Sequence, residues 1–137
     1  MSAENMQLVV EIFDTFSRST WETGDWIQRF HPQLVYHPRE DEPDTQSFVG
    51  RDTWEQIVGG FMDAFDEITF DVEDTYDADD WAIVTTVMHA SGGGSGVKVE
   101  DRYVFAYRIV DGVVVEGWEH HTMDEAVAAL RRRVAAK

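Results

Sequence analysis

The sequence predicts an α+β domain in which helices cover one face of a curved antiparallel sheet. Apolar residues recur at helical spacing in the first part of the chain, and they alternate with polar residues from about residue 68 onward. Helices gathered ahead of a run of strands joined by short turns are typical of this fold class. Because the sheet curves, we expect a hollow between the two layers.

Length, charge and composition limit the possible functions. The chain has 137 residues, 43% of them hydrophobic, which fits a single domain over residues 1–137 with its own core. The formal net charge of −16 disfavours nucleic acid and anionic membrane surfaces as partners, because neither compensates an acidic field. The start of the chain lacks a signal-peptide pattern, and no apolar run approaches the ~20 residues of a membrane span. We therefore expect a cytoplasmic protein.

Three helices are predicted before the main strands. The first spans about residues 4–19, a short second one ends before Pro32, and the third starts with a capping pattern of Asp52 and Glu55. Gly59–Gly60 costs about 1 kcal/mol per glycine relative to alanine, which indicates a close backbone approach or a kink over a bulky group. The apolar stripes are Val9, Ile12, Phe13 and Phe16; Trp26, Ile27 and Phe30; and Trp54, Ile57, Val58, Phe61, Met62 and Phe65.

The second half of the chain is predicted to form four antiparallel strands. An earlier brief strand at residues 34–37 is closed by Pro38 and followed by an acidic loop over residues 39–47, a candidate mobile lid. Thr122 and Glu125 repeat the capping pattern at the start of a last helix. We expect the four strands at residues 68–72, 81–90, 97–110 and 113–121.

The hairpin turn at Asp111–Gly112 decides the direction of Glu119. If the loop has three residues, with the glycine in the left-handed region, Ile109 pairs with Val113 and Glu119 shares the inner face with His121. A two-residue turn shifts this parity and turns Glu119 outward. We expect the three-residue form.

His89 is expected to face the same hollow, because it continues the odd-numbered positions of the strand that starts at Trp81. Desolvation in an apolar hollow raises the pKa of a carboxyl group and lowers that of an imidazole, while their pairing opposes both shifts. Glu119 and His89 are therefore a candidate acid/base pair. The competing interpretation is a structural histidine in the core.

Aromatic and polar residues on neighbouring elements complete the candidate site. Tyr36 and His37 point to opposite faces of their strand, so only one of them reaches the hollow. Asp101 lies on the mainly apolar, odd-numbered face of its strand, either in the pocket or at the wet, open end of the sheet. The candidate ligand contacts are Asp101, Trp54, Phe61, Phe65, Tyr103, Phe105, His37 and His121.

We predict no metal and no cofactor. The sequence has no cysteine, and neighbouring His120 and His121 cannot both face one ion from a strand. The glycine-rich segment 91–96 is followed by a predicted strand, whereas a phosphate-binding loop is followed by a helix N-terminus.

The order of elements resembles the SnoaL-like branch of the nuclear-transport-factor-2-like superfamily. Three local features carry the resemblance: the helix start at Gly50–Asp52, the hairpin at Asp111–Gly112, and the pair Trp118–Glu119. The resemblance spans nearly the whole chain and implies a cone-shaped α+β roll that encloses a pocket. Counted from the hairpin glycine, Glu119 falls where SnoaL-like polyketide cyclases and limonene-type epoxide hydrolases carry a catalytic aspartate.

The chain also departs from relatives in this superfamily. The arginine and second acid of the epoxide hydrolases would fall at about Val87 and His89, so that charge-balanced triad is absent. His37 matches the place of the general base in ketosteroid isomerases. Their oxyanion hole is not matched, because Phe13, Phe16 and, by approximate alignment, Phe105 occupy those regions. The resemblance is closest to the cyclases.

Taken together, these patterns predict a cofactor-free acid/base enzyme of cyclase or isomerase type acting on a small, apolar, carbonyl-bearing molecule. Glu119 is the expected proton acceptor, His89 its partner and Tyr36 the orienting group. The alternative is a non-catalytic ligand-binding or homodimerisation domain, and water activation of the epoxide-hydrolase type is less favoured. An outer face with Val84, Met88, Val104, Ala106 and Trp118 predicts a homodimer formed through the sheet.

Overall fold

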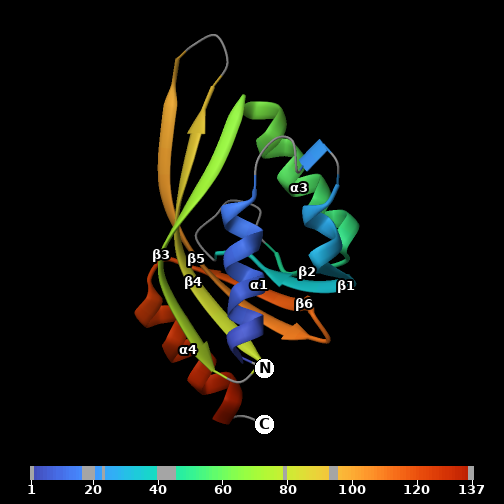
Figure 1. Ribbon diagram of the computed structural model, residues 1–137, viewed down its shortest axis with the longest axis vertical. Helices are drawn as coiled ribbons and strands as arrows, with labels where there is room; N and C mark the ends of the chain where they lie inside the picture. Colours follow the sequence, from blue (N-terminus) through green and yellow to red (C-terminus); the bar gives the residue numbers. More distant parts are fainter. Residues whose placement is uncertain are drawn as a thin grey trace.

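The structure is a computed structural model that describes residues 2–16, 21–22, 24–39, 46–78, 80–92 and 96–135, and of residue 61 the backbone only. A curved sheet forms the centre, with helices on both of its sides (Figure 1). The elements in chain order are α1 (Ser2–Asp14), the 3-10 helix η1 (Trp26–Arg29), β1 (Phe30–His37), β2 (Phe48–Val49), α3 (Arg51–Ala64), β3 (Glu67–Ala78), β4 (Trp81–Ser91), β5 (Lys98–Val110), β6 (Val113–His120) and α4 (Met123–Ala135).

The six strands form one sheet in the order β2-β1-β6-β5-β4-β3. The predicted meander of four antiparallel strands is confirmed as β3 to β6. The sheet as a whole is mixed, because β1 lies parallel to β6 and places Tyr36 beside Gly117. β2 adds a short antiparallel edge to β1. The α+β class and the curved sheet are therefore as predicted, and β1 is the strand that sequence reasoning left unplaced.

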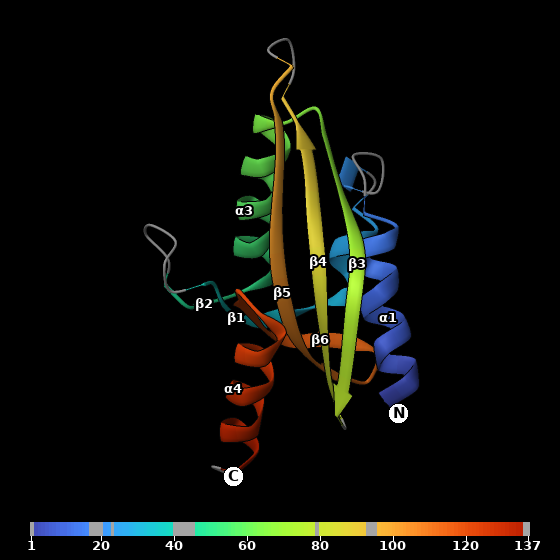
Figure 2. The same cartoon turned by 90° about the vertical axis from the view of Figure 1, so that its left-hand side faces the viewer.

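The two faces of the sheet belong to two separate cores. On the concave side, α1, η1 and α3 pack over inward residues of β1 and β3 to β6. On the convex side lies α4 (Figure 2). Its residues Ala126 and Leu130 form a second core with Trp81, Ile83 and Val104. None of the helices within the described residues is long and apolar enough to cross a membrane.

The predicted homodimer was based on an exposed apolar face of the sheet, and the structure does not leave those residues exposed as one face. Val84 and Met88 belong to the concave core, so they do not lie on the outer face. Val104 and Ala106 are on the convex side, but α4 of the same chain covers them and Trp118 packs in the same cluster. The homodimer through the sheet remains a prediction, and the exposed apolar face no longer supports it.

One helix boundary differs from the sequence prediction, while a predicted close contact and a predicted helix cap are both present. The first helix is shorter than expected, since α1 ends at Asp14. The ring of Trp21 lies over Gly59, 3.3 Å from the place of a β-carbon there, which confirms the close approach predicted at that glycine. Thr122 Oγ1 accepts a hydrogen bond of 3.1 Å from the backbone N–H of Glu125, as the capping pattern predicts. Most of the candidate lid, residues 40–45, lies outside the described residues.

Candidate functional site

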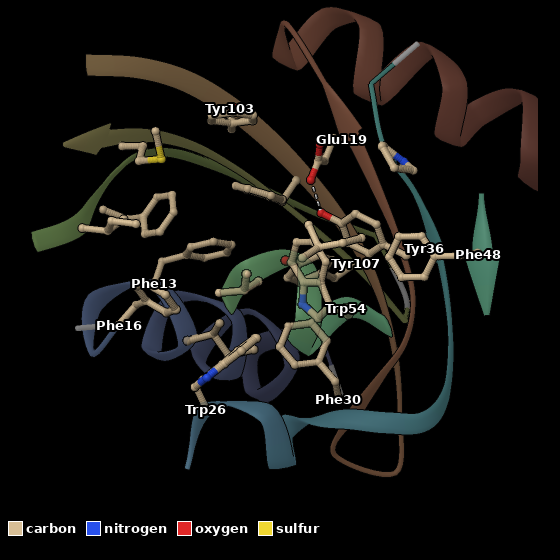
Figure 3. A pocket seen from close by; sticks show the side chains of 18 of the residues that line it. Phe13, Phe16, Trp26, Phe30, Tyr36, Phe48, Trp54, Tyr103, Tyr107 and Glu119 are labelled. Carbon is tan, nitrogen blue, oxygen red and sulfur yellow. Dashed lines mark hydrogen bonds between the residues drawn. The ribbon is translucent and has the colours of Figure 1, made fainter. Parts of the chain in front are cut away.

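A cavity of about 460 Å³ lies between the concave face of the sheet and the helices that cover it (Figure 3). This volume is within the range of small-molecule binding sites. Aromatic rings make up most of its wall, and they pack on one another edge to face or in offset stacks. The aromatic lining residues are Phe13, Phe16, Trp26, Phe30, Tyr36, Phe48, Trp54, Phe70, Tyr103, Phe105 and Tyr107.

Glu119 is the one carboxylate among the described residues that line this cavity. Its Oε2 accepts a hydrogen bond from the hydroxyl of Tyr36, whose side chain is fully buried. Figure 3 shows the two side chains meeting at one end of the aromatic chamber. A carboxylate held by a buried hydroxyl in an apolar wall is costly to desolvate, and such groups are concentrated at functional sites.

Glu119 faces inward for a reason other than the one expected from the sequence. The turn has two residues, since Val110 pairs with Val113, and both Asp111 (φ 52°) and Gly112 (φ 79°) are left-handed. The predicted three-residue turn is therefore wrong. A register shift follows at once: Ile109 pairs with Val114 but Arg108 pairs with Glu116.

This shift inserts one extra residue, Val115, into β6, which is the signature of a β-bulge. The bulge reverses the parity that the short turn imposes. As a result, Glu119 stands opposite Phe105 on the concave face, and the predicted inward direction is confirmed.

Gly117 makes room for two tyrosine rings beside Glu119. It lies between Tyr36 on β1 and Tyr107 on β5 in the sheet register. A β-carbon at this position would be 2.9 Å from Cδ2 of Tyr36 and 3.0 Å from Cε1 of Tyr107. Real β-carbons essentially never come as close as the first distance, and the second is tighter than most real contacts, so a larger residue here would force the Tyr36 ring to shift.

Tyr107 extends the polar group around Glu119. Burial and the negative charge of Glu119 raise the pKa of Tyr107 well above its ordinary value, and hydrogen bonding with Tyr36 opposes this shift. Tyr107 therefore remains a neutral hydroxyl. Tyr36 donates to Glu119 and also interacts with Tyr107, so the three side chains form one connected polar group. The sequence pattern places Tyr107 on the inner face of its strand, but it did not identify Tyr107 as a site residue. The glycine that makes room for its ring, Gly117, is adjacent to Tyr107 only through the strand register.

Two indole N–H groups in the wall have no hydrogen-bond partner within the described residues. They are Nε1 of Trp26 and Nε1 of Trp54, and both atoms are buried. The ring of Trp54 stacks on Tyr36 with centroids 4.1 Å apart, so one of these donors is close to the Tyr36–Glu119 pair. Buried donors of this kind usually have a partner, and a ligand oxygen can supply it here.

His89 does not face Glu119, so the predicted acid/base pair is wrong. Even-numbered residues of β4 face the concave core, and odd-numbered ones such as Trp81 and Ile83 lie under α4. His89 therefore lies on the convex face, where its Nε2 is 2.8 Å from Oδ2 of Asp71. The error arose because β4 is buried on both faces, so its apolar pattern does not show which face is inward.

Tyr36 and His37 lie on opposite faces of β1 as predicted, and Tyr36 is the residue that reaches the cavity. His37 lies on the other side, stacked on Trp118 with ring centroids 4.6 Å apart. It is outside the residues that line the cavity, and so is the exposed His121 just after β6.

The other candidate contacts divide into two groups. Trp54, Tyr103 and Phe105 line the cavity. Asp101 does not; it is at the open end of the sheet, 3.7 Å from Arg39, whose guanidinium lies 4.2 Å from the centre of the Tyr103 ring. Phe65 packs against the core outside the cavity wall. The side chain of Phe61 lies outside the described part of the chain.

No cluster of three or more residues able to bind a metal ion occurs in the described part of the chain. The polar groups of the cavity are thus hydroxyls, indole N–H groups, the Gln46 side chain and one carboxylate. This set can hydrogen-bond the oxygens of an apolar ligand and exchange a proton with it.

Several solved structures share this fold. AclR from Streptomyces galilaeus, a proposed hydroxylase, is 23% identical, with 96% of this chain and 98% of that chain covered and a TM-score of 0.68. A proposed SnoaL-like polyketide cyclase from Jannaschia sp. CCS1 is 18% identical, with 93% and 90% covered and a TM-score of 0.67. IdmH from Streptomyces antibioticus, a proposed polyketide cyclase, is 17% identical, with 85% and 90% covered and a TM-score of 0.67. At these identities the likeness shows the fold alone.

Sequence comparison identifies the family directly. A search among curated proteins found none that matches this chain. The family model of the SnoaL-like domain matches residues 9–117, which extend from α1 to the glycine beneath the two tyrosine rings. The resemblance inferred from the sequence is therefore confirmed, and the chain belongs to the SnoaL-like domain family.

Proposed function

We propose that this protein binds a small, largely apolar molecule with a carbonyl group and that Glu119 moves a proton at the carbon next to that carbonyl. The observation that carries the proposal is the position of Glu119, the one carboxylate among the described lining residues of an aromatic cavity. A cyclase or isomerase reaction that needs no cofactor fits this arrangement.

The hydroxyl of Tyr36 has a defined role in this proposal. By donating to Oε2, it holds the carboxylate in one orientation and stabilises its ionised form inside an apolar wall. Tyr107 stays neutral because its pKa is raised, and its hydrogen bonding with Tyr36 helps to hold the Tyr36 hydroxyl in place. Glu119 is thereby oriented as a proton acceptor for a ligand that fills the chamber.

The indole N–H groups of Trp26 and Trp54 are suited to the ligand's oxygen atoms. Removal of a proton beside a carbonyl places negative charge on the carbonyl oxygen, and fixed donors in a dry site stabilise that charge. The lack of any partner for these donors among the described residues supports a ligand that brings acceptor oxygens. The polyketide cyclase descriptions of two structural neighbours are consistent with a carbonyl-bearing ligand.

The experiment uses 2-tetralone, a bicyclic ketone with acidic protons next to its carbonyl. Quenching of tryptophan fluorescence reports its binding, because Trp26 and Trp54 line the cavity. Proton NMR in deuterated water reports exchange at the carbon beside the carbonyl. We expect the wild type to bind the ketone and to accelerate this exchange. Glu119→Gln keeps the shape of the side chain and should retain binding while losing exchange.

Glu100→Gln is the matched control, since Glu100 is exposed on β5 and is not among the residues that line the cavity. It should exchange at the wild-type rate. Equal exchange by Glu119→Gln and wild type would exclude Glu119 as the proton acceptor.

A binding protein without catalysis is the second candidate. The nearly continuous aromatic wall favours it, because such a wall stabilises an apolar ligand by burial alone. Binding of 2-tetralone without accelerated exchange would support this candidate. Epoxide opening receives less support, because the described lining holds no arginine and no second carboxylate.

A further inference from the structure

A serine, a histidine and a glutamate form a row beside the mouth of the cavity, on the side of β1 away from Glu119. Oγ of Ser47 lies 2.6 Å from Nδ1 of His37. On the other side of the imidazole, Nε2 of His37 lies 3.0 Å from Oε2 of Glu116. The three residues come from the segment before β2, from the end of β1 and from β6.

The two contacts fix the state of the neutral imidazole. A carboxylate can only accept, so Nε2 carries the hydrogen and donates it to Glu116. Nδ1 is then the acceptor, and the hydroxyl of Ser47 donates to it. This is the arrangement of a nucleophile, its base and an orienting acid, with the roles of the two ring nitrogens exchanged relative to serine proteases.

The imidazole is held by more than these two hydrogen bonds. Its ring stacks on Trp118 at an interplanar angle of 18°. The guanidinium of Arg133, on α4, lies 3.8 Å from the centre of the Trp118 ring and is attracted by the charge of Glu116. A ring fixed in this way keeps Nδ1 directed at Ser47, which is what a general base requires.

Ser47 is accessible both from solvent and from the cavity. The residue is exposed, and it lines the cavity mouth between Gln46 and Phe48. Phe48 stacks on Tyr36 with ring centroids 5.5 Å apart, so an aromatic ring entering the mouth meets an apolar surface next to the serine. A reactive hydroxyl and a place for an aryl group therefore coincide.

We propose that Ser47 is a second reactive site of this protein, a nucleophile that takes the acyl group from small aryl esters bound at the cavity mouth. His37 is its general base, and Glu116 is a positioning residue that acts through His37. This is a different reaction from the proton transfer proposed for Glu119. Ser47 and Glu119 both line the cavity, but His37 and Glu116 lie on the face of β1 and β6 that points away from it.

The reaction with p-nitrophenyl acetate shows how the groups act. Oγ of Ser47 bonds to the acetyl carbon while its proton passes to Nδ1 of His37. The bond from that carbon to the p-nitrophenol oxygen breaks, and the imidazolium proton passes to the leaving oxygen. Water then attacks the acetyl-serine and gives a proton to His37, which returns it to Oγ as acetate leaves. The net reaction is hydrolysis of the ester.

Two measurements on the full chain test this proposal together. Diisopropyl fluorophosphate should modify the wild type at Ser47, as located by peptide mass spectrometry. Release of p-nitrophenolate from the acetate ester should fall to the protein-free rate in Ser47→Ala and in His37→Gln. Glu116→Gln should slow the modification about 10-fold or more, with an unchanged melting temperature. A merely structural role of Glu116 would not change the modification rate at constant stability.

Ser91→Ala is the matched control, because Ser91 lies at the end of β4 and is not among the residues that line the cavity. It should behave as the wild type in both measurements. The proposal is overturned if no adduct maps to Ser47, or if Ser47→Ala releases p-nitrophenolate as fast as the wild type.

Discussion

The concave and convex faces of the sheet use the same types of side chain in different ways. On the convex face, Asp71 meets His89 at 2.8 Å and Glu73 meets Arg102 at 2.8 Å, and these side chains are 43–75% exposed. On the concave face, Glu119 meets a tyrosine hydroxyl inside an aromatic wall that holds no arginine, lysine or histidine among the described lining residues.

The two faces differ in what their charged groups cost or contribute to stability. Exposed ion pairs contribute about 0–1 kcal/mol each and are screened by salt, so the convex pairs add little to stability. A carboxylate in an apolar wall has a large desolvation cost, which the tyrosine hydrogen bond offsets in part.

Gly117→Ala should have the largest effect on stability. The added β-carbon would lie 2.9 Å from the Tyr36 ring, and overpacking of this kind costs about 1–3 kcal/mol. Urea unfolding measures the loss. Gly60→Ala is the matched control, since nothing lies within 4 Å of its β-carbon position in α3, and it should stabilise the protein by up to about 1 kcal/mol. A Gly117→Ala variant as stable as wild type would disprove the tight contact.

Tyr36→Phe should cost about 1–2 kcal/mol, because the partly buried carboxylate of Glu119 loses the hydrogen bond that it accepts. Chemical unfolding at neutral pH measures this change. Glu119→Gln combined with Tyr36→Phe should cost less than the sum of the two single changes, because the two residues form one interaction. Additive losses would show that the pair is not coupled.

Tyr107→Phe should change how stability depends on pH. Since the pKa of Tyr107 is raised in the fold, the unfolded chain ionises first, and stability present below pH 10 is lost as the pH rises toward the folded pKa. Between about pH 9 and about pH 11, the wild type should lose more stability than Tyr107→Phe. Denaturant titrations at each pH measure the free energy of unfolding. If it falls equally with pH in the wild type and in Tyr107→Phe, the raised pKa of Tyr107 is contradicted.

His89→Gln should have the smallest effect, below about 0.5 kcal/mol, because its partner Asp71 is 75% exposed. It should also leave ligand quenching of tryptophan fluorescence unchanged, since His89 is on the convex face. Loss of ligand binding in this variant would show that His89 takes part in the binding site.

The sequence predicted the elements of this fold better than their pairing. Helical and alternating periodicity located α3 and the strands β5 and β6, because those patterns are local. The parallel pairing of β1 with β6 joins distant segments, and no local pattern encodes it. β4 misled the parity assignment for His89, because α4 buries its second face and removes the alternation of polar and apolar residues.

The candidate site was predicted in part. Glu119 faces the cavity as expected, although the bulge at Val115 that turns it inward has no recognisable sequence signal. The sequence did not decide between Tyr36 and His37, and Tyr36 is the one that lines the cavity. The contact of Tyr107 with Tyr36 depends on the register that places Gly117 between them. A polar group made of two tyrosines and a glutamate from three strands can be seen only once the sheet is assembled.

Deuterium exchange of 2-tetralone by Glu119→Gln tests the central claim most directly. We predict that this variant still quenches its tryptophan fluorescence with the ketone but exchanges the protons beside the carbonyl no faster than protein-free solution, while Glu100→Gln exchanges as the wild type does. Exchange at the wild-type rate by Glu119→Gln would contradict the account.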